Sequence, residues 1–205
     1  MSMMKSERMS QRAVIKMDDS PVARFLFGDV RFAWVWLILR LYAGYEWVSA
    51  GWEKLRSPAW TGGTAGVALT GFIKGALAKT AGDHPDVQGW YAWFLQNAVL
   101  PRAGMWSYLV SWGEFLVGIA LILGLLTGIA AFFGSFMNVN YLLAGAISTN
   151  PLLFVIATWL VLAWKTAGWW GLDRWLLPAL GTPWSPGRVL REGGGQRMAT
   201  GPSKA

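Results

Sequence analysis

Long apolar stretches, bounded by glycine, proline or polar residues, dominate the pattern along this chain. A helix of roughly 20 apolar residues is long enough to cross a bilayer. Four stretches have about that length: residues 32–52, 106–126, 128–148 and 151–170. Thr127 and Gly128 can end the second stretch, and Asn150 followed by Pro151 is typical of a helix N-cap and first turn. The pattern therefore predicts an all-α membrane protein, a four-transmembrane-helix bundle.

The loop between the first two predicted spans, residues 53–105, has a different pattern. Residues 67–79 are amphipathic at helical spacing, with Phe72 on the apolar face and Lys74 on the polar face. Residues 90–101 are rich in aromatic side chains, which favour the headgroup region of a bilayer. Both segments are too short or too polar to span, so we expect interfacial helices that lie along the membrane surface.

The two ends of the chain are polar and basic. Residues 1–31 hold six Lys or Arg and no long apolar stretch, so we expect a cytoplasmic tail rather than a cleaved signal peptide. Ser20 before Pro21 predicts a short juxtamembrane helix within this tail. Residues 179–205 are rich in glycine, proline and basic side chains, and we expect them to be disordered. The predicted membrane domain spans residues 32–178.

Composition narrows the chemistry that this chain can carry. Only 14% of its residues are charged, against about 25% in a typical soluble domain. The net charge is +7, and the basic residues lie at the membrane-flanking ends, where they can contact anionic lipid. We therefore expect a lipid bilayer as partner and no nucleic acid. The chain has no Cys and one His, which excludes disulfides and iron–sulfur clusters within it. We expect no metal, haem or flavin site.

The distribution of Lys and Arg predicts the orientation. The N-terminal tail holds six of them, the part of the chain from Lys165 onward holds another six, and the loop 53–105 holds five spread along its length. Because basic residues concentrate on the cytoplasmic side, we expect both termini in the cytoplasm and the long loop outside. An even number of spans agrees with this arrangement. The expected location is the plasma membrane, as a multi-pass protein.

Five polar side chains fall at similar predicted depths within the spans: Arg40, Glu46, Glu114, Asn138 and Asn140. At 1.5 Å of rise per residue, they lie roughly 12–21 Å from the cytoplasmic edge. An isolated charge at such depth costs about 2.5–3.5 kcal/mol or more, so we expect these groups to form one buried polar layer.

Two interpretations of this layer stay open. It can be a structural ion pair, with Arg40 bonded to one glutamate and the asparagines bonded between helices. It can also be a catalytic centre formed by Arg40, Glu46 and Glu114, in which the two carboxyl groups exchange protons with a substrate inside the membrane. In the second case four nearby side chains are candidates for binding a flat ligand: Trp47, Trp112, Asn138 and Asn140.

Several motifs resemble those of the DoxX/DoxD family. The segment RLYAGYEWVSAGWEK (40–54) resembles the family's first-span pattern, and GEFLVGIALILGLLTGIAAFFGSFMNVN (113–140) resembles its second and third spans. AGAISTNP (144–151) and AGWWGLDRWLLP (167–178) resemble the later segments. The resemblance covers roughly residues 30 to 180 and implies a four-helix membrane protein.

The DoxD branch of that family forms the membrane subunit of thiosulfate:quinone oxidoreductase. The resemblance therefore implies that the chain oxidises thiosulfate, or a related small reductant, to tetrathionate and passes two electrons to quinone. Glu46 and Glu114 would then deliver protons to the quinone. Thiosulfate is a dianion, so its site should be basic and open to water outside, and the candidate side chains there are Glu53, Lys54 and Arg56. Without Cys, haem or flavin, electrons must pass directly or through a partner.

Two other functions remain as alternatives. One is a non-enzymatic membrane scaffold that anchors a soluble redox or stress-response partner, or a second subunit. The other is a small-molecule transporter, for which four spans leave little room unless a homo-oligomer supplies it. The sequence leaves the substrate, the partner and the oligomeric state open.

Overall fold

The structure, a computed structural model, describes residues 19–182, and every regular element in that range is helical. The all-α prediction is thereby confirmed for the described range. The predictions for the tails, 1–31 and 179–205, fall mostly on residues 1–18 and 183–205, which lie outside it.

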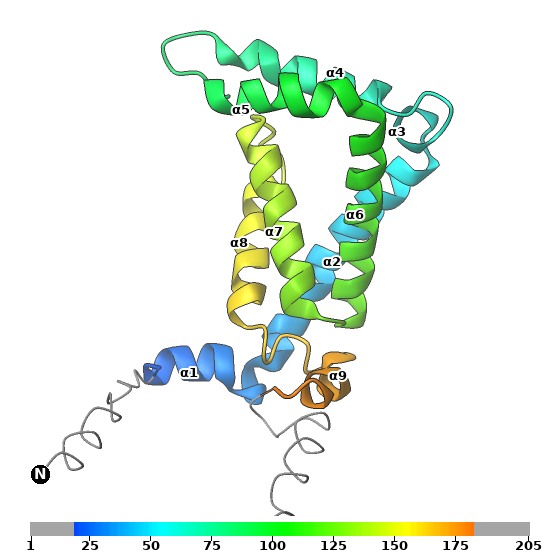
Figure 1. The fold of residues 1–205 in the computed structure, drawn as a ribbon. Coiled ribbons are helices and arrows are strands. Elements are labelled where there is room, and N and C mark those ends of the chain that lie inside the picture. The colour runs from blue at the N-terminus through cyan, green and yellow to red at the C-terminus, as the bar shows by residue number, and fades with distance from the viewer. Residues whose placement is uncertain (1–18, 183–205) are drawn as a thin grey trace, which may run out of the picture.

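The four longest helices stand side by side as a bundle (Figure 1): α2 (Ala33–Arg56), α6 (Ala103–Leu123), α7 (Thr127–Leu143) and α8 (Asn150–Leu162). Helix α2 packs against α6 and α8, α6 packs against α7, and α7 packs against α8. Buried apolar side chains from all four helices, among them Trp47, Val117, Ala131 and Leu160, form one continuous core.

Glycines set the close contact between α2 and α6. A Cβ atom added at Gly51 would lie 2.7 Å from the Cα atom of Phe115, and one added at Gly118 would lie 2.7 Å from the Cα atom of Val48. Only glycine fits at such a spacing, because the two backbones approach each other directly. The spaced glycines of the sequence therefore mark a helix–helix contact, which fixes the position of every α6 side chain relative to α2.

One end of the bundle is covered by a layer of short helices, which we call the roof (residues 58–102; upper part of Figure 1). It contains α3 (Pro58–Thr61), α4 (Val67–Leu77), the short turn η4 (Ala78–Thr80) and α5 (Gly89–Phe94). The π-helical turn η5 (Leu95–Val99) and the turn η6 (Leu100–Arg102) then lead from α5 into α6.

Helix α4 is amphipathic in the way its sequence predicts. Leu69, Ile73 and Ala76 are buried, while Lys74 is exposed. Their apolar face contributes to a second core beneath the roof, together with residues of α5 and η5 such as Tyr91. The roof therefore has a hydrophobic core of its own, separate from that of the bundle.

The opposite end of the bundle, which we call the base, carries α1 (Pro21–Gly28), η3 (Val30–Phe32) and α9 (Asp173–Ala179) (Figure 1). The Ser20 hydroxyl accepts a hydrogen bond from the Ala23 N–H at 3.2 Å and so caps α1. The Trp36 indole N–H donates to the Leu26 carbonyl at 2.9 Å. Helix α1 is therefore fastened to the start of α2.

Three helix boundaries differ from the predicted ones. The break after α6 falls at Gly124 and Leu126, which have φ values of 63° and 46°, and Thr127 is the first residue of α7. Helix α8 is preceded by Thr149, while the Asn150 side chain donates to the Ala146 carbonyl at 2.9 Å instead of acting as N-cap. Helix α8 also ends at Leu162, before the predicted end at residue 170.

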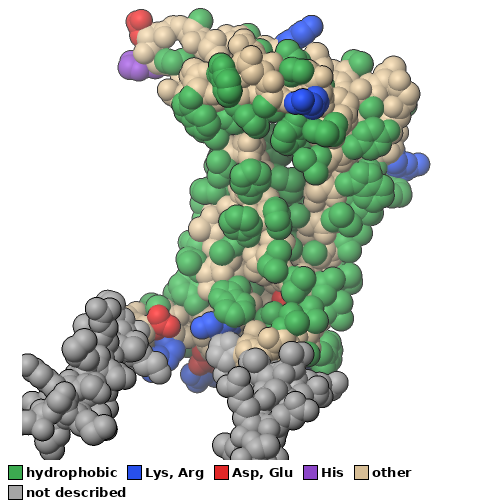
Figure 2. All heavy atoms as spheres, in the orientation of Figure 1, with side chains coloured by type: hydrophobic (Ala, Val, Ile, Leu, Met, Phe, Trp, Pro, Cys, Tyr) green, Lys and Arg blue, Asp and Glu red, His purple; other side chains and the backbone are tan. Residues whose placement is uncertain are grey.

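Hydrophobic side chains cover the middle of the face shown in Figure 2, and Lys and Arg lie near its two ends. Within the described range, one helix is long and apolar enough to cross a bilayer by itself, the continuous segment Gly89–Leu123. Helix α8 is apolar but shorter. Four membrane spans therefore remain a prediction.

Candidate functional site

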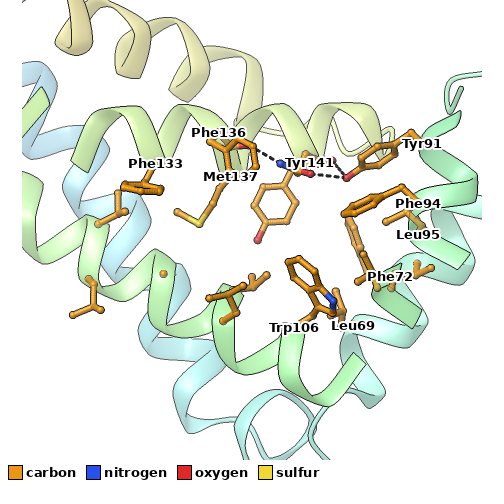
Figure 3. A pocket seen from close by; sticks show the side chains of 18 residues that line it. Leu69, Phe72, Tyr91, Phe94, Leu95, Trp106, Phe133, Phe136, Met137 and Tyr141 are labelled. Carbon is orange, nitrogen blue, oxygen red and sulfur yellow. Dashed lines mark hydrogen bonds between the residues drawn. The ribbon is translucent and has the colours of Figure 1, made fainter. Parts of the chain in front are cut away.

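A cavity of about 460 Å³ lies beneath the roof, between α6 and α7 (Figure 3). Its volume is within the range of roughly 300–1,000 Å³ found for small-molecule sites. Its lining is mostly aromatic and aliphatic, and includes Leu69, Phe72, Trp106, Phe133, Phe136 and Met137. Lining residues of both helices are more than half exposed, Leu109 and Leu116 of α6 and Phe133 and Phe136 of α7, so the cavity opens to the surface between these helices.

A polar group from the roof closes one side of the cavity. The Tyr91 hydroxyl donates to the backbone carbonyl of Asn140 at 2.9 Å and to its side-chain Oδ1 at 3.1 Å (Figure 3). The Asn140 amide donates in turn to the Phe136 carbonyl at 2.8 Å. Burial raises the pKa of Tyr91 to about 12, so its hydroxyl stays protonated and remains a donor. These bonds tie α5 to α7.

Tyr141 connects the cavity to the buried charge of α6. Its ring lines the cavity and meets the Phe72 ring edge to face, with 5.9 Å between the ring centroids. Its hydroxyl donates a short hydrogen bond to Oε1 of Glu114. The Glu114 side chain is 1% exposed and belongs to the middle of α6, nine residues before Leu123, or about 13 Å along the helix.

Lys54 completes the group. Its ammonium nitrogen lies 2.6 Å from Oε2 of Glu114, as an ion pair between the last turn of α2 and the middle of α6. We call these residues the Lys54–Glu114–Tyr141 triad. Three helices meet in it, and each oxygen of the carboxylate has a partner. A buried carboxylate needs such partners, because an unpaired buried charge costs several kcal/mol.

The far side of the triad faces a second, polar pocket of about 240 Å³, lined by Glu53, Lys54, Ser57 and Trp60. The Lys54 side chain is 19% exposed there, and its ammonium nitrogen lies 5.2 Å from the centroid of the Trp60 ring. We call this the outer pocket. The triad therefore lies between a polar pocket and an apolar cavity, with hydrogen bonds linking the two.

Arg40, predicted to share a layer with Glu114, lies at the base of the bundle. Its side chain is buried, and one guanidinium nitrogen donates to the Trp170 carbonyl at 3.1 Å. Asp173, close enough to attract it electrostatically, accepts hydrogen bonds from the N–H groups of Leu126 and Thr127 at 2.6 and 2.8 Å. The expected pair between Arg40 and a glutamate is not formed, because Arg40 lies 14 residues before Lys54 in α2, about 21 Å along the helix, and Lys54 is the residue that reaches Glu114.

The other predicted side chains in the spans fall in three environments. Glu46 is half-buried in α2 and forms no hydrogen bond or ion pair within residues 19–182. Trp47 and Asn138 are buried, and in the described chain neither the Trp47 indole N–H nor the Asn138 amide has a hydrogen-bond partner. Trp112 is about half exposed on the outer surface of α6 and contacts Phe115.

The predicted thiosulfate residues are partly brought together. Glu53 and Lys54 both line the outer pocket. Arg56 is exposed and stands over the Trp52 ring, with its guanidinium carbon 5.5 Å from the ring centroid. The three side chains therefore lie at the same end of α2, but only the first two share a pocket.

Sequence reasoning missed the two tyrosines that define the cavity, Tyr91 and Tyr141. One signal for Tyr141 was present, since a tyrosine inside an apolar stretch needs a partner for its hydroxyl. Tyr91 carries no such signal, because aromatic residues in a roof segment are expected at a membrane surface in any case. Its partner, Asn140, lies 49 positions further along the chain.

A family model described as DoxX matches residues 35–146, which is more than half of the 205 residues. The chain belongs to the DoxX family. The suspected resemblance is thereby confirmed, and with it the environment of a lipid bilayer, since DoxX is a membrane family. Neither the curated proteins nor the solved structures gave a match. The matched range of this DoxX protein includes all three residues of the Lys54–Glu114–Tyr141 triad.

Proposed function

We propose that this DoxX-family protein is the quinone-binding membrane subunit of an oxidoreductase, with thiosulfate as the first candidate reductant. One observation carries the proposal. The apolar cavity ends on the Tyr141 hydroxyl, and that hydroxyl is bonded to Glu114, the single charged residue between Arg102 and Lys165. An apolar cavity with a proton-exchanging group at one side suits a lipid-soluble ring that takes up protons when it is reduced.

In the proposed arrangement, α2, α6, α7 and α8 cross the plasma membrane, with the base in the cytoplasm and the roof outside. The basic residues near the two ends support it, because Lys and Arg are favoured where the chain leaves the hydrocarbon. The cavity then opens toward the acyl chains between α6 and α7. The outer pocket faces the water on the roof side.

The residues that line the cavity fit a quinone. Aromatic side chains such as Phe72, Trp106 and Phe136 can pack against a flat ring, while Tyr91 and Tyr141 supply hydroxyls that can bond ring oxygens. A bound quinone would supply an acceptor for two electrons and two protons. Tyr141 would hold or donate a proton at its hydroxyl oxygen, and Glu114 would orient that hydroxyl.

For the reductant, the end of α2 offers cations near water. The ion pair with Glu114 offsets much of the charge of Lys54, and Glu53 adds a negative charge to the same pocket. Arg56 is exposed and has no acidic partner within residues 19–182, so it is the stronger candidate for attracting the thiosulfate dianion. Electrons would then pass to quinone directly or through a second subunit.

The test uses the full-length protein in nanodiscs, with a short-chain benzoquinone and thiosulfate. Binding is followed by tryptophan fluorescence quenching, and turnover by quinone absorbance. Tyr141→Phe removes one hydroxyl and should weaken quinone binding about tenfold, the size of one good hydrogen bond. Glu114→Gln should lower turnover by about 100-fold or more, as expected for loss of an acid–base group.

Tyr45→Phe is the matched control, because Tyr45 is 64% exposed on α2 and does not line the cavity. If Tyr141→Phe and Tyr45→Phe bind the quinone equally, the cavity is not the quinone site. Binding without turnover would favour the scaffold alternative, in which a soluble partner supplies the electrons. Flux of thiosulfate into liposomes without redox change would favour the transporter.

A further inference from the structure

The same carboxylate, Glu114, faces two compartments. Its Oε1 atom binds the Tyr141 hydroxyl, whose ring lines the apolar cavity. Its Oε2 atom lies 2.6 Å from the Lys54 ammonium, which lines the outer pocket. Every neighbouring pair in this series is within hydrogen-bond distance, and each group can both give up and take back a proton. The series therefore links the water-facing end of α2 to the cavity.

Toward the base of the bundle, no further hydrogen-bonded group of the described chain continues the series beyond Glu114. Below it, the α2–α6 contact is closed by Gly118 against Val48 and by Gly44 against Ile122, with no space even for a methyl group. Among the described residues, Glu114 has no hydrogen-bond partner other than Lys54 and Tyr141. The nearest buried cation toward the base, Arg40, is bonded to the Trp170 carbonyl instead.

We propose that the Lys54–Glu114–Tyr141 triad is a proton path that connects the cavity to the roof side of the membrane alone. This inference rests on the proposed function, since it names the route by which a quinone in the cavity takes its protons. Each proton leaves the Tyr141 hydroxyl for a ring oxygen. The Lys54 ammonium then protonates the Glu114 carboxylate, and the resulting carboxyl group passes that proton to Tyr141. Glu114 is thereby returned to its carboxylate form, and Lys54 regains a proton from water in the outer pocket.

The stoichiometry follows from the chemistry. Two thiosulfate ions form one S–S bond in tetrathionate and release two electrons. Quinone takes up those two electrons together with two protons, so two protons pass through the triad per turnover. Because electrons and protons then enter from the same side, no net charge crosses the bilayer. The reaction should therefore be electroneutral and should raise the pH on the roof side only.

A labelling experiment tests the path without turnover. The natural chain has no Cys, so an introduced one is the only thiol. Glu114→Cys in right-side-out and inside-out membrane vesicles is treated with a charged, membrane-impermeant methanethiosulfonate. We expect labelling from the roof side and none from the base side. Leu121→Cys, in the same helix and fully buried, should be labelled from neither. Labelling of Glu114→Cys from the base side would overturn the path.

Substitution of Lys54 separates a structural role from proton transfer. Lys54→Arg keeps a positive charge beside Glu114 and so keeps the fold, but arginine does not release a proton in proteins. We expect unchanged quinone binding and a turnover lower by about 100-fold. Lys74→Arg, at an exposed position of α4, is the matched control. Wild-type turnover in Lys54→Arg would overturn the path.

Impermeant pH dyes on the two sides of sealed vesicles complete the test. Thiosulfate-driven quinone reduction should consume protons on the roof side, and proton uptake on the base side would contradict the path while leaving the proposed function intact. If thiosulfate drives no turnover but Glu114→Cys is labelled from the roof side alone, the proposed reaction fails and the water-connected path is supported. The two failures are therefore distinguishable.

Discussion

At the scale of single residues, buried polar groups in this protein divide into paired and unpaired ones. Glu114 has a partner for each carboxylate oxygen, and Asp173 bonds two backbone N–H groups. Asn138 is equally buried, yet its amide has no partner in the described chain. Leaving such a group unpaired costs about 1–3 kcal/mol. Asn138 therefore stays a candidate for ligand binding, whereas Asp173 has a structural role as the cap of α7.

Tyr91 gives a prediction about pH. Its pKa is raised by burial from 10.0 to about 12, so its contribution to the stability of the roof is complete below pH 10 and is lost as the pH rises through about 12. We expect the near-ultraviolet circular dichroism of the tryptophans to change in that interval. Tyr91→Phe should remove this step. Overlapping titrations of the two proteins would contradict the assignment.

At the scale of elements, glycine positions and capping decide how the helices meet. Gly51 and Gly118 let α2 and α6 touch along their backbones, which brings Lys54 to Glu114. The Asp173 carboxylate accepts the first N–H groups of α7, although it comes from α9, 46 positions beyond Thr127. The start of α7 therefore depends on a residue from another element.

The helix contact gives a second prediction. Gly118→Ala places a methyl group against the backbone of Val48 and should lower the free energy of unfolding by about 1–3 kcal/mol, as overpacking does. Gly71→Ala is the matched control, because no atom lies within 4 Å of the added methyl group in α4. It should raise the stability by about 0.5–1 kcal/mol. Denaturant titrations in detergent micelles measure both, and equal stability of the two variants would contradict the close contact.

At the scale of the whole molecule, the two ends of the bundle expose a different kind of surface from its middle. The roof and the base lie at opposite ends of the bundle (Figure 1), and the middle of the face shown in Figure 2 is hydrophobic. The triad lies off centre, with its partly exposed lysine on the roof side. Such asymmetry is what a protein needs if it exchanges protons with one side of a membrane.

The proposed topology can be tested with single cysteines. His84→Cys, in the loop between α4 and α5, should react with an impermeant thiol reagent on intact spheroplasts. Asp19→Cys and Leu180→Cys, both exposed and near the base, should react only after the membrane is opened. Reaction of all three under the same conditions would contradict the arrangement of four spans with both ends inside.

The sequence by itself determined the helical class, the family and most of the helix positions. Apolar stretches and glycine spacing are local properties, so they can be recognised in the sequence without any knowledge of the fold. It also identified Glu114 and Lys54 as unusual, since a charge within or beside an apolar stretch is rare and costly.

Only the tertiary structure decided which of these charges meet. Depth along a helix gives a position along one axis but not the direction in which a side chain points. The sequence therefore predicted Arg40 as the partner of a glutamate and placed Lys54 in a separate thiosulfate site. The tilt of α2 and its glycine contact with α6 bring Lys54 to the carboxylate, and Gly124, Trp170 and Asp173 surround Arg40. The cavity likewise depends on the roof folding back over α6 and α7, a contact between residues far apart in the chain.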